Sequence, residues 1–150
     1  MDSKQINFSP IGIIHTPFDG LDKIPRQGRY GEHNDGWVEL FPEYLDGLLG
    51  LMSFSHVYLL FQFHQSKAFS LIQTTPRHQL TKGVFAIRSP RRPNGIGMTI
   101  VKLKKIDGNR IYFAGADMIE GTPLLDIKPY TSEIDCYPEA INGWVNGERK

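Results

Sequence analysis

The most regular pattern along this chain is alternation of apolar and polar residues over short stretches, which is typical of β-strands. The longest such stretch is 54–64, in which successive side chains point to opposite faces. One face would carry Val57, Leu59, Phe61 and Phe63, and the other His56, Tyr58, Leu60, Gln62 and His64. Both sets contain aromatic or aliphatic residues. We therefore expect this strand to be covered on both sides, by a barrel interior and by a partner subunit or loop.

Shorter alternating or β-branched stretches predict further strands at 11–14, 37–40, 83–87, 98–106 and 110–115. Asp107-Gly-Asn109 separates the last two and is typical of a hairpin turn. Residues 42–50 predict one short helix, since Pro42 suits a first turn and Gly50 can end it. Strands dominate, so we expect a mainly β fold, a small β-barrel with one or two short helices and long loops, as a single domain over residues 1–150.

Composition narrows the class of protein but does not reveal its chemistry. With 40% hydrophobic and 22% charged residues, the 150-residue chain resembles an ordinary globular domain. The net charge of +1 requires any nucleic-acid site to be a local patch. A single cysteine, Cys136, excludes a disulfide framework and fits a reducing compartment. The longest apolar run, 57–61, is too short to span a membrane, so we expect a cytoplasmic protein.

An arginine-rich loop stands between the expected strands 83–87 and 98–106. It holds Arg88, Arg91 and Arg92 among two prolines and two glycines. Gly95-Ile-Gly-Met-Thr-Ile100 is close to the GxGxxG motif, but the third glycine is missing and a β-branched stretch follows where a helix is needed. We therefore exclude a Rossmann nucleotide site. The closely spaced prolines and glycines predict a shaped loop at the barrel rim.

Five motifs in order resemble the TsaA-like family of S-adenosylmethionine-dependent tRNA methyltransferases. They are Ile24-Pro-Arg-Gln27, Phe54-Ser-His56, Phe63-His-Gln65, Gly83-Val-Phe-Ala-Ile-Arg-Ser-Pro with the loop to Met98, and Gly121-Thr-Pro-Leu-Leu-Asp-Ile-Lys-Pro-Tyr130. The resemblance covers about residues 8–135. It implies a single-sheeted β-barrel, a homodimer, and methylation of N6 of threonylcarbamoyl-adenosine beside the tRNA anticodon. Some members carry a further C-terminal domain thought to help hold the tRNA; a dimer would be one way to rebuild that surface here.

The resemblance also implies which positions contact S-adenosylmethionine. The matching residues are Pro25, Arg26, Gln27, His64, Gln65, Arg88, Ile100, Glu120, Gly121, Thr122 and Pro123. Their chemistry is consistent with this role, since glutamine amides hydrogen-bond a purine and an arginine can hold a carboxylate in a bidentate way. Phe63, Tyr58 and Tyr130 are alternatives for an aromatic partner of the cofactor.

Catalytic and nucleic-acid roles are hypotheses with fewer constraints. Asp126 or Lys128 is a candidate for orienting the substrate amine or taking its proton, although the two would also share a strand face and pair with each other. Asn94 is a second candidate for substrate contact. Arg91 and Arg92 are the expected tRNA contacts, beside Arg88. The five histidines lack metal-ligand spacing, so we expect no metal.

Two other functions remain open from the sequence. One is methyl transfer to a smaller or different acceptor. The other is a non-enzymatic barrel that binds RNA through the arginine loop, which would not need the Pro-Arg-Gln, His-Gln and Gly-Thr-Pro motifs together.

Overall fold

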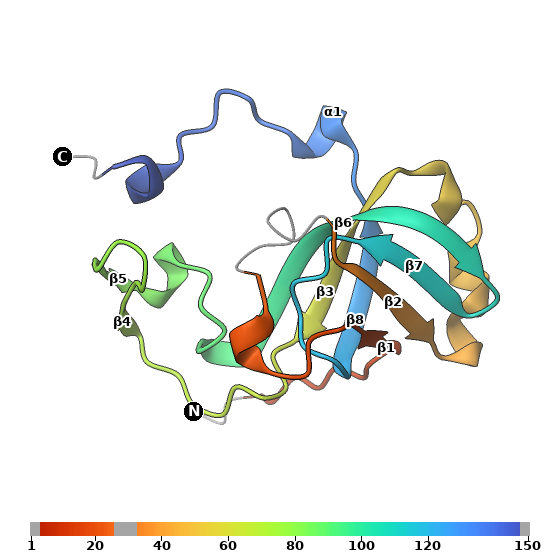
Figure 1. The fold of residues 1–150 in the computed structure, drawn as a ribbon, viewed down its shortest axis with the longest axis horizontal. Coiled ribbons are helices and arrows are strands. Elements are labelled where there is room, and N and C mark those ends of the chain that lie inside the picture. Colours follow the sequence, from red (N-terminus) through yellow and green to blue (C-terminus); the bar gives the residue numbers. More distant parts are fainter. Residues whose placement is uncertain (1–3, 26–32, 148–150) are drawn as a thin grey trace.

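A computed structural model describes residues 4–25 and 33–147 and contains a closed six-stranded barrel. The barrel strands are β1 (Gly12–His15), β2 (Asp35–Leu40), β3 (His56–Gln62), β6 (Ile96–Asp107), β7 (Arg110–Ala114) and β8 (Thr122–Pro129). They follow the order β1-β2-β7-β6-β3-β8, and β8 closes the circle by pairing with β1 (Figure 1). Every pairing is antiparallel. The expected single-sheeted β-barrel is therefore confirmed.

The inward-facing side chains of all six strands form one apolar core. Fully buried members include Ile14, Val38, Leu59, Val101, Ile111 and Leu124. The parity predicted for 54–64 is confirmed, because Val57, Leu59 and Phe61 are buried while His56, Tyr58 and Leu60 are half-buried. Gly97 faces the interior where the Phe61 ring fills the space: a Cβ there would lie 2.3 Å from the Phe61 ring.

Two local predictions need correction. The stretch 83–87 is not a strand: only β5 (Thr81–Gly83) pairs, with β4 (Ile72–Thr74), and Val84–Ala86 forms a 3-10 turn. The apolar pattern there has another cause, since Val84 alone is buried and Phe85 is 79% exposed. The helix expected at 42–50 is a 3-10 helix, Pro42–Leu48, with no buried residue.

The sequence pattern assigned no strand bounds to the region of β8, because Pro123 and Pro129 interrupt it. A proline cannot donate to a strand ladder and is confined to positions that lack a partner. In the structure Pro123 lies opposite Ile13 of β1 and Pro129 opposite Val57 of β3. Each proline thus stands near an end of β8 and has a register partner in only one neighbouring strand, whereas Leu124 pairs with both β1 and β3.

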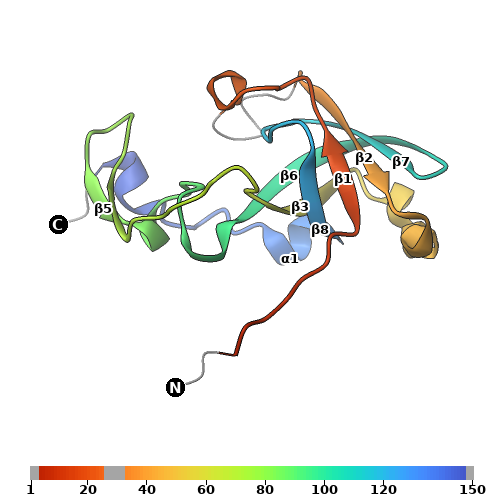
Figure 2. The same cartoon turned by 90° about the horizontal axis from the view of Figure 1, so that it is seen from below.

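An arm and a tail extend from the barrel. The arm comprises the β4–β5 hairpin and its flanking loops between β3 and β6, and the tail contains α1 (Ser132–Asp135) and short 3-10 helix Gly143–Asn146 (Figure 1 and Figure 2). The tail meets the arm where the Trp144 indole donates to the Ala86 carbonyl at 2.8 Å and lies edge-on to His78. Other short 3-10 helices are Leu21–Lys23, Leu51–Ser53 and Pro93–Gly95.

Candidate functional site

Three long connections meet at one end of the barrel. β1, β3 and β7 end there, and β2, β6 and β8 begin there, so the segments 16–34, 63–95 and 115–121 all start from this rim. Because β3 and β8 are neighbours, Phe63 follows one strand end beside the start of the other. The topology therefore brings together most of the positions implied as cofactor contacts, although they are far apart in the sequence.

The arginine loop has a defined shape that its own hydrogen bonds maintain. Asn94 and Gly95 have left-handed backbone angles, with φ of 65° and 55°. The Arg92 guanidinium donates to the carbonyl of Ile87 at 2.9 Å and to that of Ser89 at 3.4 Å. Gln73 of the arm donates to the Arg91 carbonyl at 2.6 Å. Arg92 is thus used inside the loop, whereas the Arg91 side chain is exposed.

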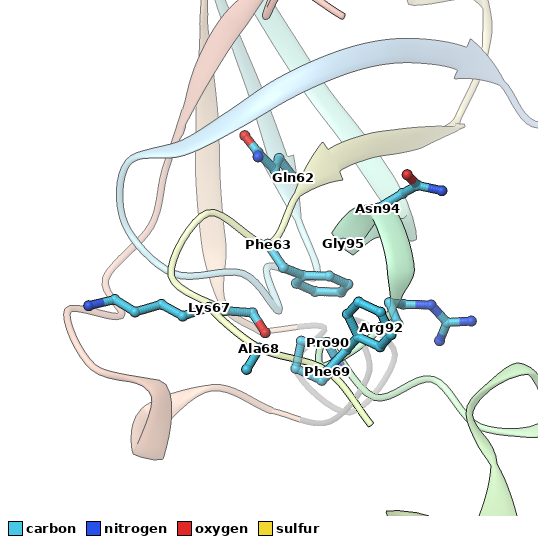
Figure 3. A pocket seen from close by; sticks show the side chains of 10 residues that line it. Gln62, Phe63, Lys67, Ala68, Phe69, Pro90, Arg92, Asn94 and Gly95 are labelled. Carbon is cyan, nitrogen blue, oxygen red and sulfur yellow. The ribbon is translucent and has the colours of Figure 1, made fainter. Parts of the chain in front are cut away.

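A cavity of about 200 Å³ lies between this loop and the end of β3 (Figure 3). Its lining residues include Phe63, Phe69, Lys67, Arg92, Gln62 and Asn94. In Figure 3 the Lys67 ammonium and the Gln62 and Asn94 amides point away from the two phenyl rings. The Phe63 backbone N–H donates to the Gly95 carbonyl at 2.8 Å, which ties the two walls of the cavity together. The two rings suit a ligand with an aromatic or cationic group. None of the described positions implied as cofactor contacts lines this cavity.

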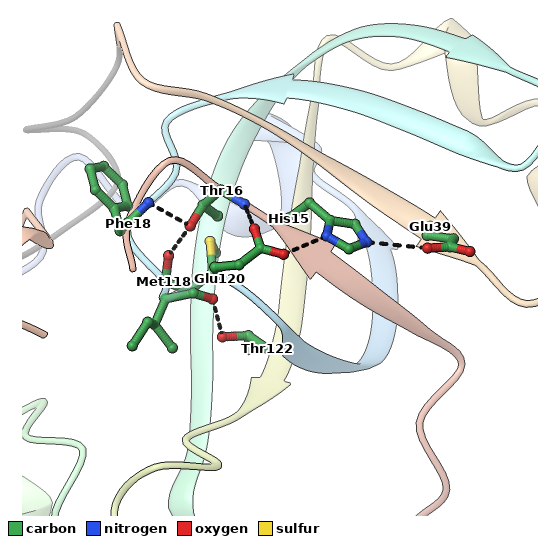
Figure 4. Close-up of polar contacts among 8 residues, drawn as sticks. His15, Thr16, Phe18, Glu39, Met118, Glu120 and Thr122 are labelled. Carbon is green, nitrogen blue, oxygen red and sulfur yellow. Dashed lines mark hydrogen bonds and ion pairs between the residues drawn. The ribbon is translucent and has the colours of Figure 1, made fainter. Parts of the chain in front are cut away.

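A second polar cluster occupies the adjacent rim, around Glu120 (Figure 4). The Thr16 backbone N–H donates to one carboxylate oxygen of Glu120 at 2.8 Å, and His15 Nδ1 lies 2.5 Å from the other. The opposite ring nitrogen of His15 lies 3.2 Å from a Glu39 oxygen. The Thr16 hydroxyl donates to the Met118 carbonyl. Both bonds to Glu120 come from the end of β1, so its carboxylate is a preorganised acceptor at the rim.

The turn that precedes β8 is built tightly. The Thr122 side chain is buried and its hydroxyl donates to the Ile119 carbonyl at 2.6 Å, while the Gly121 N–H donates to the Ile14 carbonyl at 3.0 Å. Gly121 has φ of 81°, a left-handed angle that glycine adopts without strain. The Thr122 side chain therefore serves the turn, and Gly121 and the half-buried Pro123 are the parts exposed toward the rim.

The remaining implied cofactor positions differ in how much the structure says of them. His64, Gln65 and Arg88 are exposed and lie on the connection that leaves β3 or on the arginine loop. Pro25 is half-buried at the edge of the described chain, and Arg26 and Gln27 lie outside the described residues. Ile100 is the exception, because it stands in the middle of β6, opposite Tyr58, on the outer surface of the barrel.

Two of the three catalytic candidates lie on that outer surface as well. Lys128 and Asp126 form the ion pair that the sequence had suggested, with 3.0 Å between Lys128 Nζ and Asp126 Oδ2. Their strand neighbours are Tyr58 and Leu60. Asn94 is the candidate that lines the cavity.

Sequence reasoning missed several residues of this region. Lys67 and Phe69 line the cavity, yet they lie in a stretch without regular pattern. The Asp117 carboxylate accepts the hydroxyl of the buried Thr99 at 2.7 and 2.8 Å, and His15 reaches Glu120 across 105 positions of sequence. No spacing rule joins residues so far apart. Among the described residues, no cluster of three potential metal ligands is present, and no helix is long and apolar enough to cross a bilayer.

Known proteins are similar to this chain in sequence. A probable S-adenosyl-L-methionine-binding protein of Pyrococcus abyssi is 41% identical over 140 residues, which cover 93% of this chain and 76% of that protein. The human tRNA (adenine(37)-N6)-methyltransferase is 40% identical over 133 residues, covering 84% of this chain and 30% of the human protein. This chain thus spans less than a third of the human relative.

A solved structure has the same architecture. The crystal structure of TrmO from Pseudomonas aeruginosa superposes with a TM-score of 0.81 at 38% identity, covering 97% of this chain and 65% of that chain. The family profile described as the tRNA-methyltransferase O N-terminal domain matches residues 13–136, which is most of the chain. This range includes all five motifs. This chain belongs to the family of tRNA-methyltransferase O N-terminal domains.

Proposed function

We propose that this protein binds S-adenosylmethionine at the barrel rim and transfers its methyl group to N6 of threonylcarbamoyl-adenosine beside the anticodon of tRNA. The observation that carries the proposal is that the Phe63-His-Gln65 motif, the arginine loop and the Gly121-Thr-Pro123 turn all follow or precede strands at one end of the barrel, where the cavity of Phe63, Lys67 and Asn94 also lies. The relatives support it, since one bears the name of a cofactor-binding protein and another that of a tRNA methyltransferase. The single cysteine fits a cytoplasmic setting.

The residues at the rim fit such a cofactor. The Phe63 and Phe69 rings suit an aromatic or cationic group, the Gln62 amide suits a purine edge, and the Lys67 cation suits a carboxylate. Glu120 offers a fixed carboxylate for hydroxyl donors. When bound, S-adenosylmethionine supplies an electrophilic methyl group on a sulfonium centre.

The chain's own contribution is positioning and removal of one proton. Displacement at a methyl carbon requires the acceptor nitrogen in line with the leaving sulfur, and two rigid strand ends with a shaped loop provide such a frame. Asn94 lines the cavity and is the candidate to orient the acceptor. Asp126 stays a candidate base. It is 46% exposed and held by Lys128, so the N6 proton would pass to it only if the acceptor reaches the outer surface of β8.

A homodimer accounts for the positions that lie off the rim. Ile96, Met98 and Ile100 are 43%, 52% and 42% exposed in a row on the outer surface of β6. Leu60 and Tyr58 of β3 lie beside them. A second copy covering this surface would bury the row and bring Ile100 and Asp126 toward the rim of its partner. Under this arrangement Ile100 contacts the cofactor of the other protomer.

The test is transfer of a labelled methyl group from S-adenosylmethionine to tRNA, with and without the threonylcarbamoyl modification. We expect label in the modified tRNA alone.

Asn94→Ala should retain cofactor binding and lower turnover at least tenfold, and Asp126→Asn should do the same if Asp126 is the base. Full turnover in Asp126→Asn would remove that role. Arg91 keeps its predicted phosphate contact, so Arg91→Gln should weaken tRNA binding most at low salt.

One relative favours a second candidate function. The Pyrococcus abyssi protein, three quarters of which this chain matches, is named only for binding the cofactor. The same site would then methylate a smaller acceptor. Cofactor binding with no label in either tRNA, followed by label in a small-molecule fraction, would select this function.

A further inference from the structure

The outer surface of β1, β2, β7 and the second half of β6 carries a row of side chains that are not part of the rim site. His15, Trp37, Tyr112 and Lys105 come from β1, β2, β7 and β6, and each is the register partner of the next. We call these four residues the cross-strand row. The His15 ring stacks on Trp37 with centroids 4.1 Å apart, Trp37 lies 6.3 Å from Tyr112, and the Lys105 ammonium stands 4.8 Å from the centre of the Tyr112 ring.

Cations surround this row. Arg110 lies over Trp37, with 4.6 Å between the guanidinium carbon and the ring centre. Lys102 and Lys104 are exposed on the same surface, and Lys104 is 2.7 Å from Asp35. Within residues 4–25 and 33–147, Lys102, Lys105 and Arg110 form no ion pair. Three carboxylates lie on the same surface: Asp35 is paired with Lys104, Glu39 lies against His15 and opposite Arg110 in register, and Asp107 closes the hairpin.

The row is continuous with the rim site. Its first member, His15, is the residue whose other side lies 2.5 Å from Glu120. A polymer whose reacting unit enters the rim near Glu120 would therefore pass directly onto Trp37 and Tyr112. Aromatic rings and cations on one outer surface are the combination that binds single-stranded nucleic acid, by base stacking and phosphate contact. A base would stack here by displacing Arg110 or Lys105 from its ring.

From this geometry we propose that the cross-strand row, with Lys102 and Arg110, binds the RNA strand next to the nucleotide held at the rim. The inference rests on the proposed function for the identity of the substrate. It assigns the stacking contacts to the β2–β7–β6 surface, a different part of the molecule from the arginine loop. An acidic peptide would satisfy the cations but would leave the aromatic faces unused.

The test measures RNA binding directly, without cofactor and without turnover. A fluorescein-labelled, unmodified anticodon stem-loop RNA is titrated with the full chain at several salt concentrations, and anisotropy gives the affinity. In Lys102→Gln/Lys105→Gln we expect the slope of log affinity against log salt to become shallower by roughly 1.4, from two lost phosphate contacts on a single strand. Tyr112→Leu should weaken binding roughly tenfold with the slope unchanged, because a stacking contact is lost and no charge is removed.

The matched control is Lys4→Gln/Arg77→Gln, which removes two exposed cations elsewhere and should leave the slope at its wild-type value. Trp37 supplies an independent signal. The chain has two tryptophans, so Trp144→Phe leaves Trp37 as the sole indole, and RNA should quench its fluorescence. Thermal unfolding of each variant confirms that it is folded.

Failure of this inference is distinguishable from failure of the proposed function. Equal RNA affinity and slope in the wild type, the lysine variant and Tyr112→Leu, with methyl transfer to tRNA intact, would overturn the inference alone. RNA binding that depends on the row, without methyl transfer to any tRNA, would support the inference and reject the reaction. Displacement of the RNA by poly-glutamate with the same dependence on Tyr112 would also overturn it.

Discussion

The two halves of the barrel wall share one interior and differ in what they present outward. We call the outer surface of β3, β8 and the first half of β6 the apolar wall, with Ile96, Met98 and Ile100 in a row. The outer surface of β1, β2, β7 and the second half of β6 is the cationic wall, with Trp37, Tyr112 and the lysines. Strand β6 crosses from one to the other between Ile100 and Lys102.

The comparison separates the inward side chains, whose apolar character folding requires, from the outward side chains, whose composition folding does not determine. On the inner side both halves contribute buried aliphatic or aromatic residues, because closing the barrel needs a continuous core. On the outer side nothing in the monomer requires either composition. We therefore propose a partner for each outer surface, a second copy for the apolar wall and RNA for the cationic wall.

The largest expected effect tests the shared interior. Leu59→Ala in the apolar half and Ile111→Ala in the cationic half should each lower the free energy of unfolding by about 2–5 kcal/mol, since both side chains are fully buried. Denaturant unfolding of the two variants measures this. A loss below about 1 kcal/mol in one of them would mean that its half of the wall is not part of a single core.

A smaller effect should separate the two outer surfaces by self-association. Ile100→Asp places a charge in the centre of the apolar wall and should weaken the proposed dimer by on the order of 2 kcal/mol, since the charge must be desolvated on association. Lys105→Asp places the same carboxylate on the cationic wall and should leave the dimer intact. Sedimentation equilibrium compares them. Equal dissociation in both variants, or a monomeric wild type, would contradict the assignment of the apolar wall.

The stacked cations of the cationic wall should contribute modestly to stability. Arg110→Gln removes the guanidinium from the Trp37 ring and should cost about 0.5–1 kcal/mol of unfolding free energy. Lys102→Gln is the matched variant, because Lys102 stands over no ring among the described residues, and its effect should be near zero. If both variants unfold at the same denaturant concentration as the wild type, the contact is not stabilising in solution.

The smallest effect concerns pH and the apolar wall. Partial burial, followed by the negative charge of Asp135, raises the pKa of Tyr58 above its ordinary value. A raised pKa in the folded state means that folding favours the neutral phenol. The contribution of Tyr58 to the free energy of unfolding is therefore fully present below pH about 10 and is lost as the pH rises through the folded pKa. The free energy of unfolding, measured up to alkaline pH, should decline as the pH rises, and this decline should be weaker in Tyr58→Phe.

Asp135→Asn provides the companion variant for that titration. It removes the charge that α1 places near Tyr58, and the alkaline decline should become intermediate between those of the wild type and Tyr58→Phe. Three superimposable pH profiles would show that Tyr58 does not couple to folding.

The sequence predicted the barrel well where strands alternate and less well where local chemistry conflicts with pairing. Alternation identified β3, β6 and β7 and the hairpin at Gly108, because a strand with one buried face must repeat every two residues. It misassigned 83–87, where a buried Val84 imitates a strand within a 3-10 turn. The prolines prevented the prediction of β8. A proline is tolerated only where its strand lacks a hydrogen-bonding neighbour, and the local sequence does not show where that is the case.

For the candidate site, the sequence identified the residue types, and the tertiary structure decided which of them lie close together. The motifs Phe63-His-Gln65 and Gly121-Thr-Pro123 were recognisable in the chain, and the order of strands placed them side by side. The contacts of His15 with Glu120 and of Thr99 with Asp117 were not predictable, since barrel closure alone brings these residues together.

The sequence by itself determined the strand periodicity, the family and the identity of the polar groups, because these depend on residue type and short spacing. Only the tertiary structure decided that Ile100, Asp126 and Lys128 lie on an outer wall, and that Trp37 and Tyr112 share a row with His15. The physical reason is that inward or outward direction alternates along each strand, but the register between strands, set by barrel closure and by bulges at Leu103/Lys105 and Leu60/Phe61, decides which side chains meet.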